Sequence, residues 1–103
     1  MARLYRSPRA KRDIADVLAY TRDRWGLAQA RAYRDLIREA LKSIAADPKC
    51  GKVRGARPGI PSHHIKLPGR NARHVVFYRI SRDGAVEIVR VLHDSMDFDQ
   101  HLP

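Results

Sequence analysis

The first half of the chain carries two runs of apolar residues at helical spacing. Ser7 and Pro8 supply the start of the first run, because Ser accepts hydrogen bonds from first-turn amides and Pro is tolerated at the first helical position. Gly26 ends it, since glycine adopts the left-handed conformation without steric penalty. The positions that predict this amphipathic helix are Ala10, Ile14, Val17, Leu18, Thr21 and Trp25.

A second helix is predicted directly after Gly26. Its apolar stripe runs from Ala30 to Ile44, and Pro48 ends it by restricting the residue before it. So short a connection predicts an antiparallel helical hairpin. The apolar stripes of two helices cannot cover each other completely, so another layer must lie against them.

Strands are predicted before and after this hairpin. Leu4 and Tyr5 suffice for a short strand at the start of the chain. Residues 48–61 are rich in Pro, Gly and basic residues and are predicted as a loop. Three strands then follow over 63–67, 73–81 and 86–92, joined by short turns, and residues 96–102 form a last helical turn.

This order predicts an α+β fold in two layers, with the helical hairpin packed on an antiparallel sheet and a single domain over residues 1–103. The helices are expected to face the sheet through Ile14, Val17, Leu18, Ile37, Leu41 and Ile44. The side chains of the sheet that are expected to pack against the helices are Val76, Tyr78, Ile80, Ile88 and Leu92. A register slip of one residue would replace these with Val75, Phe77, Val89 and Val91.

Positive charge is concentrated in the second half. The chain has 21 Lys and Arg against 11 Asp and Glu, a formal net charge of +10. No carboxylate falls between Asp47 and Asp83, a segment that holds many Lys and Arg. This asymmetry favours a site for an acidic partner, either a nucleic acid or an acidic protein segment. Only Phe77 and Tyr78 are aromatic within that segment, which favours a protein over a single strand stacked on aromatic side chains.

Several classes of protein are excluded by composition. The longest apolar run, residues 75–78, is far shorter than the ~20 residues of a spanning helix, and no apolar run follows the basic N-terminus as it would in a secretory signal. A single Cys excludes a disulfide framework and fits a reducing cytosol. We therefore expect a soluble cytoplasmic protein with no membrane partner.

Metal binding receives no support from the spacing of possible ligands. The candidates are His63, His64, His74, His93 and Cys50. Adjacent His63 and His64 point to opposite faces of a strand, and no pair has the usual zinc spacing. We expect no metal and no cofactor.

Ribonuclease chemistry needs a general base, a general acid and cations for the phosphorane. Arg73, Arg79 and Arg90 lie on predicted strands, and His74 or His93 could serve as the acid. No carboxylate base falls between residues 48 and 82. A binding role for these side chains is therefore favoured over a catalytic one.

Three phrases, in this order, resemble a known family. They are YTRDRWG at 20–26 with AQARAY at 28–33, RHVVFYR at 73–79, and VRVLHDSMD at 89–97. Together with the strand–helix–helix–three-strand order they are similar to the RelE/ParE superfamily of type II toxin–antitoxin systems, and locally closer to ParE. The resemblance covers nearly the whole chain.

The resemblance implies a growth-inhibiting bacterial toxin. ParE members inhibit DNA gyrase and block replication, whereas RelE members cleave messenger RNA on the ribosome with basic, acid/base and C-terminal aromatic side chains. This chain has no Tyr after Tyr78 and ends with Phe98 in that segment. A gyrase inhibitor without catalytic residues is therefore expected. A ribosome-dependent mRNA endoribonuclease is the alternative, and a chain that only co-represses with its antitoxin is a third possibility.

The resemblance also implies a partner, a ParD-like antitoxin with an acidic C-terminal segment. That segment would lay a helix across the hairpin and pair with the sheet edge, in a hetero-oligomer that reaches DNA only through the antitoxin. The candidate antitoxin-binding residues are Arg57, Arg73, Arg79, Leu18 and Trp25. The candidate target-binding residues are His93, Met96, Asp97 and Phe98.

Overall fold

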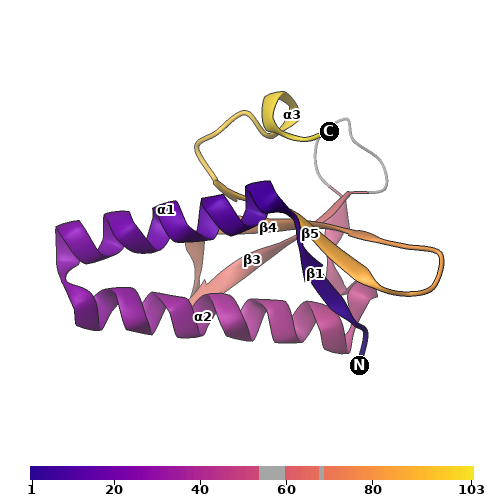
Figure 1. The fold of residues 1–103 in the computed structure, drawn as a ribbon, viewed down its shortest axis with the longest axis horizontal. Coiled ribbons are helices and arrows are strands. Elements are labelled where there is room, and N and C mark those ends of the chain that lie inside the picture. The colour runs from indigo at the N-terminus through magenta and orange to yellow at the C-terminus, as the bar shows by residue number, and fades with distance from the viewer. Residues whose placement is uncertain (54–59, 68) are drawn as a thin grey trace.

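The computed structural model describes residues 1–53, 60–67 and 69–103. Within these ranges, a 5-stranded sheet has the strand order β1-β5-β4-β3-β2, and two long helices cover one of its faces (Figure 1). This confirms the predicted α+β class. In chain order the elements are β1 (Leu4–Arg6), α1 (Pro8–Trp25), α2 (Leu27–Ala46), the 3₁₀ turn η1 (Pro48–Cys50), β2 (Lys52–Val53), β3 (Pro61–Leu67), β4 (Arg70–Ile80), β5 (Val86–His93) and α3 (Phe98–His101).

The helical hairpin begins and turns where the sequence predicts. The Ser7 hydroxyl accepts a hydrogen bond from the Ala10 amide at 3.0 Å and donates one to the Val89 carbonyl at 2.8 Å. The cap therefore also ties the start of α1 to β5. Gly26 alone separates α1 from α2 and has φ 97°, a conformation that side chains with a Cβ rarely adopt. The antiparallel hairpin is confirmed.

The sheet combines an antiparallel meander with one parallel strand. β3, β4 and β5 pair antiparallel as predicted, while β1 pairs parallel with β5 through Leu4↔Val86 and Arg6↔Ile88. The prediction of an unbroken loop over 48–61 is wrong, because that segment contains η1 and β2, and β2 pairs with β3 at Lys52↔Ser62. Two residues of strand are too few for a hydrophobic pattern to reveal.

The main core lies between the hairpin and the sheet. Ile37, Leu41 and Ile44 of α2 are buried against the sheet, as predicted. Ile14 and Leu18 of α1 are only partly buried against the same cluster, and half-buried Val17 is not part of it. The shallower burial follows from the position of α1, which lies over β5 toward the β1 edge, whereas α2 lies over β3.

A bulge in β5 changes which side chains face the helices. Phe77 pairs with Arg90 but Tyr78 pairs with Ile88, so Val89 is the extra residue and the alternation of faces shifts by one. The prediction holds for Val76, Tyr78 and Ile88, which pack in the core against the helices. It is wrong for Leu92, which lies on the opposite face while Val91 takes its place, and for Ile80, which is 43% exposed.

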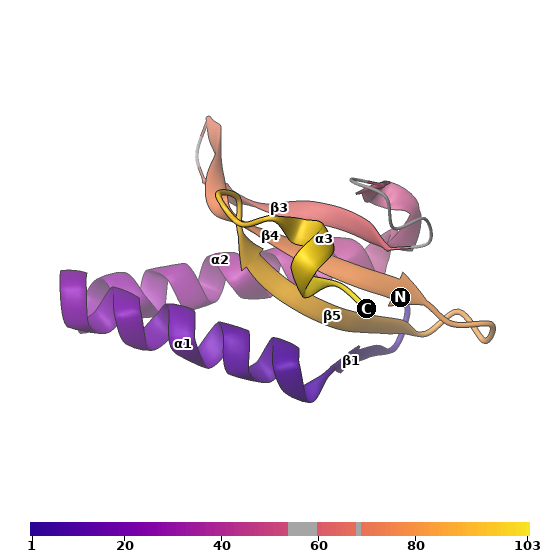
Figure 2. The same ribbon diagram turned by 90° about the horizontal axis from the view of Figure 1, so that it is seen from above.

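The second face of the sheet is covered by the C-terminal segment, residues 94–103. Met96 and Phe98 pack there, and the rings of Phe77 and Phe98 meet edge to face at 4.8 Å between centroids. Figure 2 shows α3 lying over the strands, away from α1 and α2. The buried residues of this smaller cluster are Ile60, Val75, Phe77, Leu92 and Leu102.

Candidate functional site

A groove of about 510 Å³ opens where the tip of the helical hairpin meets the ends of β3, β4 and β5. Its walls come from segments far apart in the sequence, and none of the described residues that line it is an Asp or Glu. Exposed Tyr20 and Trp25 form its outer rim, with 66% and 64% of their surface exposed. The remaining lining residues are Thr21, Gln29, Ala32, Tyr33, Leu36, Leu67, Ala72, Arg73, His74 and His93. We call this the tip groove.

Three ring side chains meet on the floor of the tip groove. The hydroxyl of Tyr33 lies 2.8 Å from Nδ1 of His74. His74 contacts His93 edge to face, with 5.3 Å between the centroids. Nδ1 of His93 accepts a hydrogen bond from the Ser95 amide at 3.1 Å, so a neutral His93 carries its proton on Nε2. The pairing of β4 with β5 at His74↔His93 brings the two imidazoles together.

Burial disfavours the charged forms of Tyr33 and His74 on the floor of the tip groove. It raises the pKa of Tyr33 to about 12, with a smaller contribution from the negative charge of Asp94. Burial also lowers the pKa of His74, and the neighbouring His93 lowers it further, while Asp94 acts in the opposite direction. Near neutral pH, Tyr33 is therefore a phenol and His74 a neutral imidazole.

A carboxylate that sequence reasoning missed lies beside the tip groove. Nε of Arg73 donates to the Asp94 carboxylate at 2.9 Å, and the Asp94 amide donates to the Arg73 carbonyl at 2.7 Å. The strand pairing places residue 94 opposite residue 73, although the segment around Arg73 is free of acids along the chain. A prediction of the β4–β5 register would have revealed the pair.

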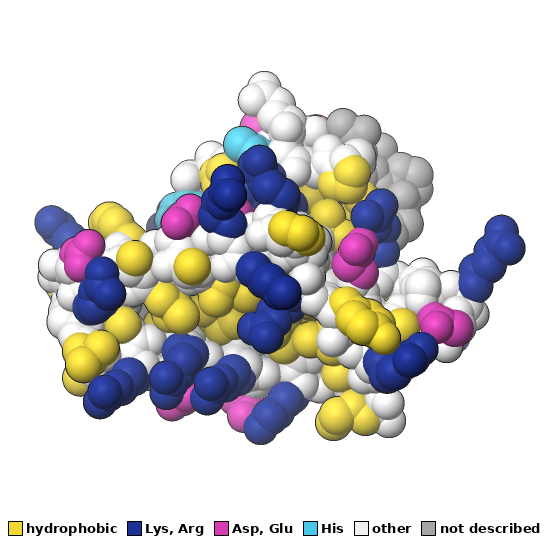
Figure 3. All heavy atoms as spheres, viewed as in Figure 1, with side chains coloured by type: hydrophobic (Ala, Val, Ile, Leu, Met, Phe, Trp, Pro, Cys, Tyr) yellow, Lys and Arg dark blue, Asp and Glu magenta, His cyan; other side chains and the backbone are white. Residues whose placement is uncertain are grey.

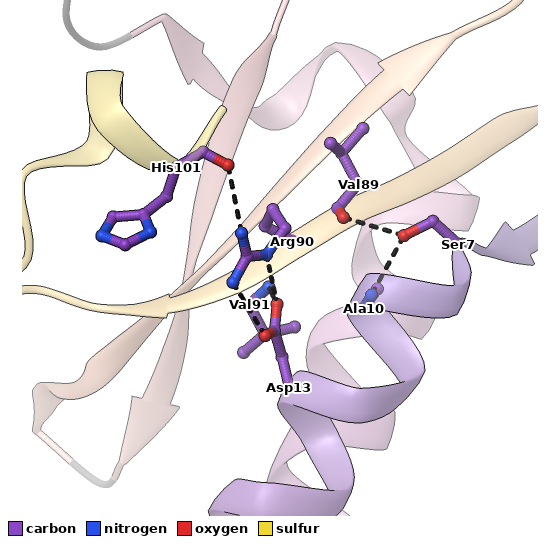
Figure 4. A network of polar contacts seen from close by, with 7 residues as sticks. All are labelled: Ser7, Ala10, Asp13, Val89, Arg90, Val91 and His101. Carbon is purple, nitrogen blue, oxygen red and sulfur yellow. Dashed lines mark hydrogen bonds and ion pairs between the residues drawn. The ribbon is translucent and has the colours of Figure 1, made fainter. Parts of the chain in front are cut away.

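Arg90 is a structural residue rather than a free cation. Its guanidinium donates two hydrogen bonds to Asp13 of α1, at 2.8 and 3.0 Å, and a third at 3.2 Å to the carbonyl of His101 (Figure 4). Asp13 also accepts from the Val91 amide at 2.9 Å. Only 11% of the Arg90 side chain and 14% of the Asp13 side chain are exposed. The pair joins α1, β5 and the C-terminal segment.

The four candidate target-binding residues all lie in or next to the C-terminal segment, but they do not form one exposed cluster. Met96 and Phe98 are partly buried against the sheet. The Asp97 carboxylate caps α3 through the Asp99 amide at 3.2 Å. His93 contributes instead to the tip groove.

The candidate antitoxin-binding residues are spread over three places. Trp25 and Arg73 lie together at the tip groove. Arg79 is bound to Glu87 at 2.9 Å near the opposite end of the sheet, where it lines a second pocket with Tyr5 of β1. Arg57 lies outside the described residues.

Leu18 belongs to a groove of about 420 Å³ between α1 and α2. We call it the hairpin groove. Small and apolar side chains form its floor, and Figure 3 shows hydrophobic surface in the hollow between the helices with Lys and Arg along the α2 side. The basic residues that line it are Arg22, Arg31 and Arg34.

No group of three or more His, Cys, Asp or Glu side chains that could hold a metal ion occurs in the described part of the chain. The five candidate ligands divide instead into separate places. His74 and His93 meet in the tip groove, whereas Sγ of Cys50 lies 3.7 Å from Nδ1 of His63. The structure thus identifies His63 as a neighbour of the Cys50 thiol. In the same described ranges no helix is long and apolar enough for a membrane span.

Comparison with known proteins identifies relatives that match almost the whole chain. The family model described as ParE toxin of the type II toxin–antitoxin system parDE matches residues 4–98. Toxin ParE1 of Mycobacterium tuberculosis is 36% identical over 97 residues, which cover 93% of each chain. Toxin ParE1 of Caulobacter vibrioides is 36% identical over 99 residues with the same coverage.

Solved structures share the fold at lower identity. A chain of the chromosomal ParDE system from P. aeruginosa superposes with a TM-score of 0.72 at 18% identity, covering 90% of this chain and 96% of that one. A chain of the toxin–antitoxin complex RelBE2 from Mycobacterium tuberculosis superposes with a TM-score of 0.61 at 21% identity, covering 89% and 96%. At such identities the likeness concerns the fold.

Proposed function

The chain belongs to the ParE toxin family of type II toxin–antitoxin systems, and from this premise we propose that it inhibits DNA gyrase in the bacterial cytoplasm until a ParD-like antitoxin neutralises it. In this account the chain acts by binding and catalyses no reaction. It has one partner that silences it and one target that it blocks.

The proposed antitoxin contact centres on the hairpin groove. A helix of an acidic segment would place apolar side chains on Leu18 and its small neighbours, and carboxylates beside Arg22, Arg31 and Arg34. The apolar anchors would hold the complex, while the charges mainly speed and orient the encounter. The extended part of the same segment would pass along the sheet edge at β1 and meet Arg79, since an edge strand offers unpaired backbone groups.

The state of Arg90 supports an inhibitor over a ribonuclease. A phosphorane needs a cation that is free to turn toward it. Arg90, which the sequence indicated for this role together with Arg73 and Arg79, is engaged by Asp13 and the His101 carbonyl, with little of its side chain exposed. The chain also has no tyrosine beyond Tyr78.

For the gyrase contact we propose the C-terminal segment together with His93. Asp97 and the half-exposed edges of Met96 and Phe98 would present it, because Arg90 and the small cluster on the second face hold this segment in one place.

The experiment expresses the chain without its antitoxin in bacteria and follows DNA and protein synthesis separately. We expect DNA synthesis to stop first, with gyrase trapped on cleaved DNA, and co-expression of the antitoxin to restore growth. Early arrest of translation with mRNA cut at codon positions would contradict the proposal.

That contrary result would favour the second candidate, a ribosome-dependent mRNA endoribonuclease. The observation that favours this second candidate is that His74, His93 and Arg73 line one groove. His74, His93 and Arg79 would then be the first residues to substitute. A chain that leaves both syntheses untouched would fit a pure co-repressor.

A further inference from the structure

Two aromatic side chains of the tip groove, Tyr20 and Trp25, lie outside both the hairpin groove and the C-terminal segment. Tyr20 and Trp25 are large aromatic side chains held mostly in solvent, although burying either would be favourable. They lie beside hydrogen-bonding groups of Tyr33, His74 and His93. Exposed aromatic surface next to polar groups marks a place where a ligand with a flat, partly apolar face can bind.

The cations around these rings define the charge of that ligand. Arg24 lies over the Trp25 ring, with Cζ 5.4 Å from the centroid, and Arg73 lines the groove. The Arg73 side chain is 70% exposed, so its ion pair with Asp94 contributes little free energy. Another anion can therefore replace Asp94 at small energetic cost. His93 also lines the groove and adds a ring nitrogen that can hydrogen-bond to a ligand. The ligand is therefore flat at one end and anionic at the other.

A nucleotide has this combination of properties, and the size of the groove fits it. A volume of about 510 Å³ has room for about one or two nucleotides of a single strand. Within the acid-free segment of the sequence the aromatic side chains do not alternate with the basic ones. The fold supplies the missing aromatics from the helices and places them beside Arg73.

We propose that the tip groove binds single-stranded DNA, with a base stacked on Trp25 or Tyr20 and the adjacent phosphate held by Arg73 and His93. The choice of DNA over RNA rests on the proposed action against gyrase, an enzyme that opens DNA. The bases are read by stacking alone, so little sequence preference is expected.

The test uses the full chain, purified free of antitoxin, and a labelled oligothymidylate of about five nucleotides. Trp25 is the only tryptophan of the chain, so its fluorescence reports directly on the groove. We expect the oligonucleotide to quench it in a saturable way. Fluorescence anisotropy of the label then compares the variants.

Two matched pairs of variants separate the groove from general positive charge. Arg73→Ala and Arg79→Ala each remove one exposed arginine with a carboxylate partner at 2.9 Å. Trp25→Leu and Tyr5→Leu each remove one exposed aromatic ring, and Tyr5 lies at β1, outside the groove. We expect Arg73→Ala and Trp25→Leu to weaken binding about tenfold, and their partners to change it less than about twofold.

Three results would overturn the proposal. The first is an equal loss of affinity in both variants of either pair. The second is that a duplex or a polyglutamate of the same charge binds the wild-type chain as tightly as the single strand does. The third is that an RNA of the same sequence binds about tenfold more tightly than the DNA. A supercoiling assay on the same preparations keeps the two proposals apart. If the wild-type chain binds the oligonucleotide but leaves gyrase active, the proposed function fails while the groove assignment stands. If the chain inhibits gyrase but does not bind the oligonucleotide, only the groove assignment fails.

Discussion

At the scale of single residues, Asp13 is bound more tightly than any other carboxylate whose contacts are described above. It accepts two hydrogen bonds from Arg90 and one from the Val91 amide, all between 2.8 and 3.0 Å. An ion pair so largely removed from solvent costs much when one partner is lost, because the remaining charge keeps its desolvation penalty. An exposed pair of similar length contributes little.

Asp13→Asn is therefore expected to lower the free energy of unfolding by about 3 kcal/mol. The matched control is Glu87→Gln, which breaks the exposed pair with Arg79 and should cost less than about 1 kcal/mol. Urea unfolding of both variants measures the difference. Equal losses would show that the Asp13–Arg90 pair does not join the elements as described.

The pH dependence of stability is set in part by His74. Burial lowers its pKa in the folded chain below the ordinary 6.5, and the same direction holds for His63. Above pH 6.5 both histidines are neutral in the folded chain and in the unfolded chain, so their contribution to stability is fully present. As the pH falls through 6.5 and below, the unfolded chain takes up protons first, and stability is lost.

His74→Gln should make stability less dependent on pH between 6.5 and about 5, because one of the two groups responsible is gone. Adding His63→Gln should flatten the profile further. The measurement is the free energy of unfolding in urea at a series of pH values. An unchanged slope in His74→Gln would refute the assignment.

At the scale of elements, the helices were predictable and the sheet only partly so. Ser7, Gly26 and Pro48 are local signals that act within one or two turns, so α1 and α2 could be predicted from the sequence. The bulge at Val89 is set by how β5 pairs with β4, and nothing local to residues 86–92 marks it. It is the reason that Leu92 and Val91 exchange faces.

The candidate site was predictable to the same extent. Trp25 and Arg73 were predicted to bind the antitoxin and His93 to bind the target, and the structure brings all three into one groove. Asp94 beside Arg73 and Asp13 beside Arg90 were missed, because these contacts join residues 21 and 77 positions apart. Such pairs follow from strand register and helix placement rather than from residue type.

The C-terminal segment yields a prediction at this scale. Phe98→Ala removes the ring that packs on Phe77, and it should destabilise the chain by about 2 kcal/mol, less than for a fully buried ring. The exposed neighbour Gln100→Ala is the control and should be nearly neutral. Urea unfolding tests both. Equal stability of the two variants would mean that this segment does not cover the second face in solution.

At the scale of the whole molecule, the charge of +10 governs encounters with acidic partners. Rising salt should slow association of the antitoxin strongly and change its dissociation much less, because charge steers the approach while apolar anchors hold the complex. Stopped-flow kinetics at a series of salt concentrations measure both rates. An association rate that does not change with salt concentration would show that charge does not steer the encounter.

The central claim is that this ParE-family chain blocks gyrase by binding to it. The most direct measurement is DNA supercoiling by purified gyrase, with the chain added alone and then together with its antitoxin. The account predicts that the chain alone stops supercoiling and accumulates cleaved DNA on gyrase, and that the antitoxin restores activity. Full supercoiling in the presence of excess chain, with mRNA cleavage on purified ribosomes, would contradict it.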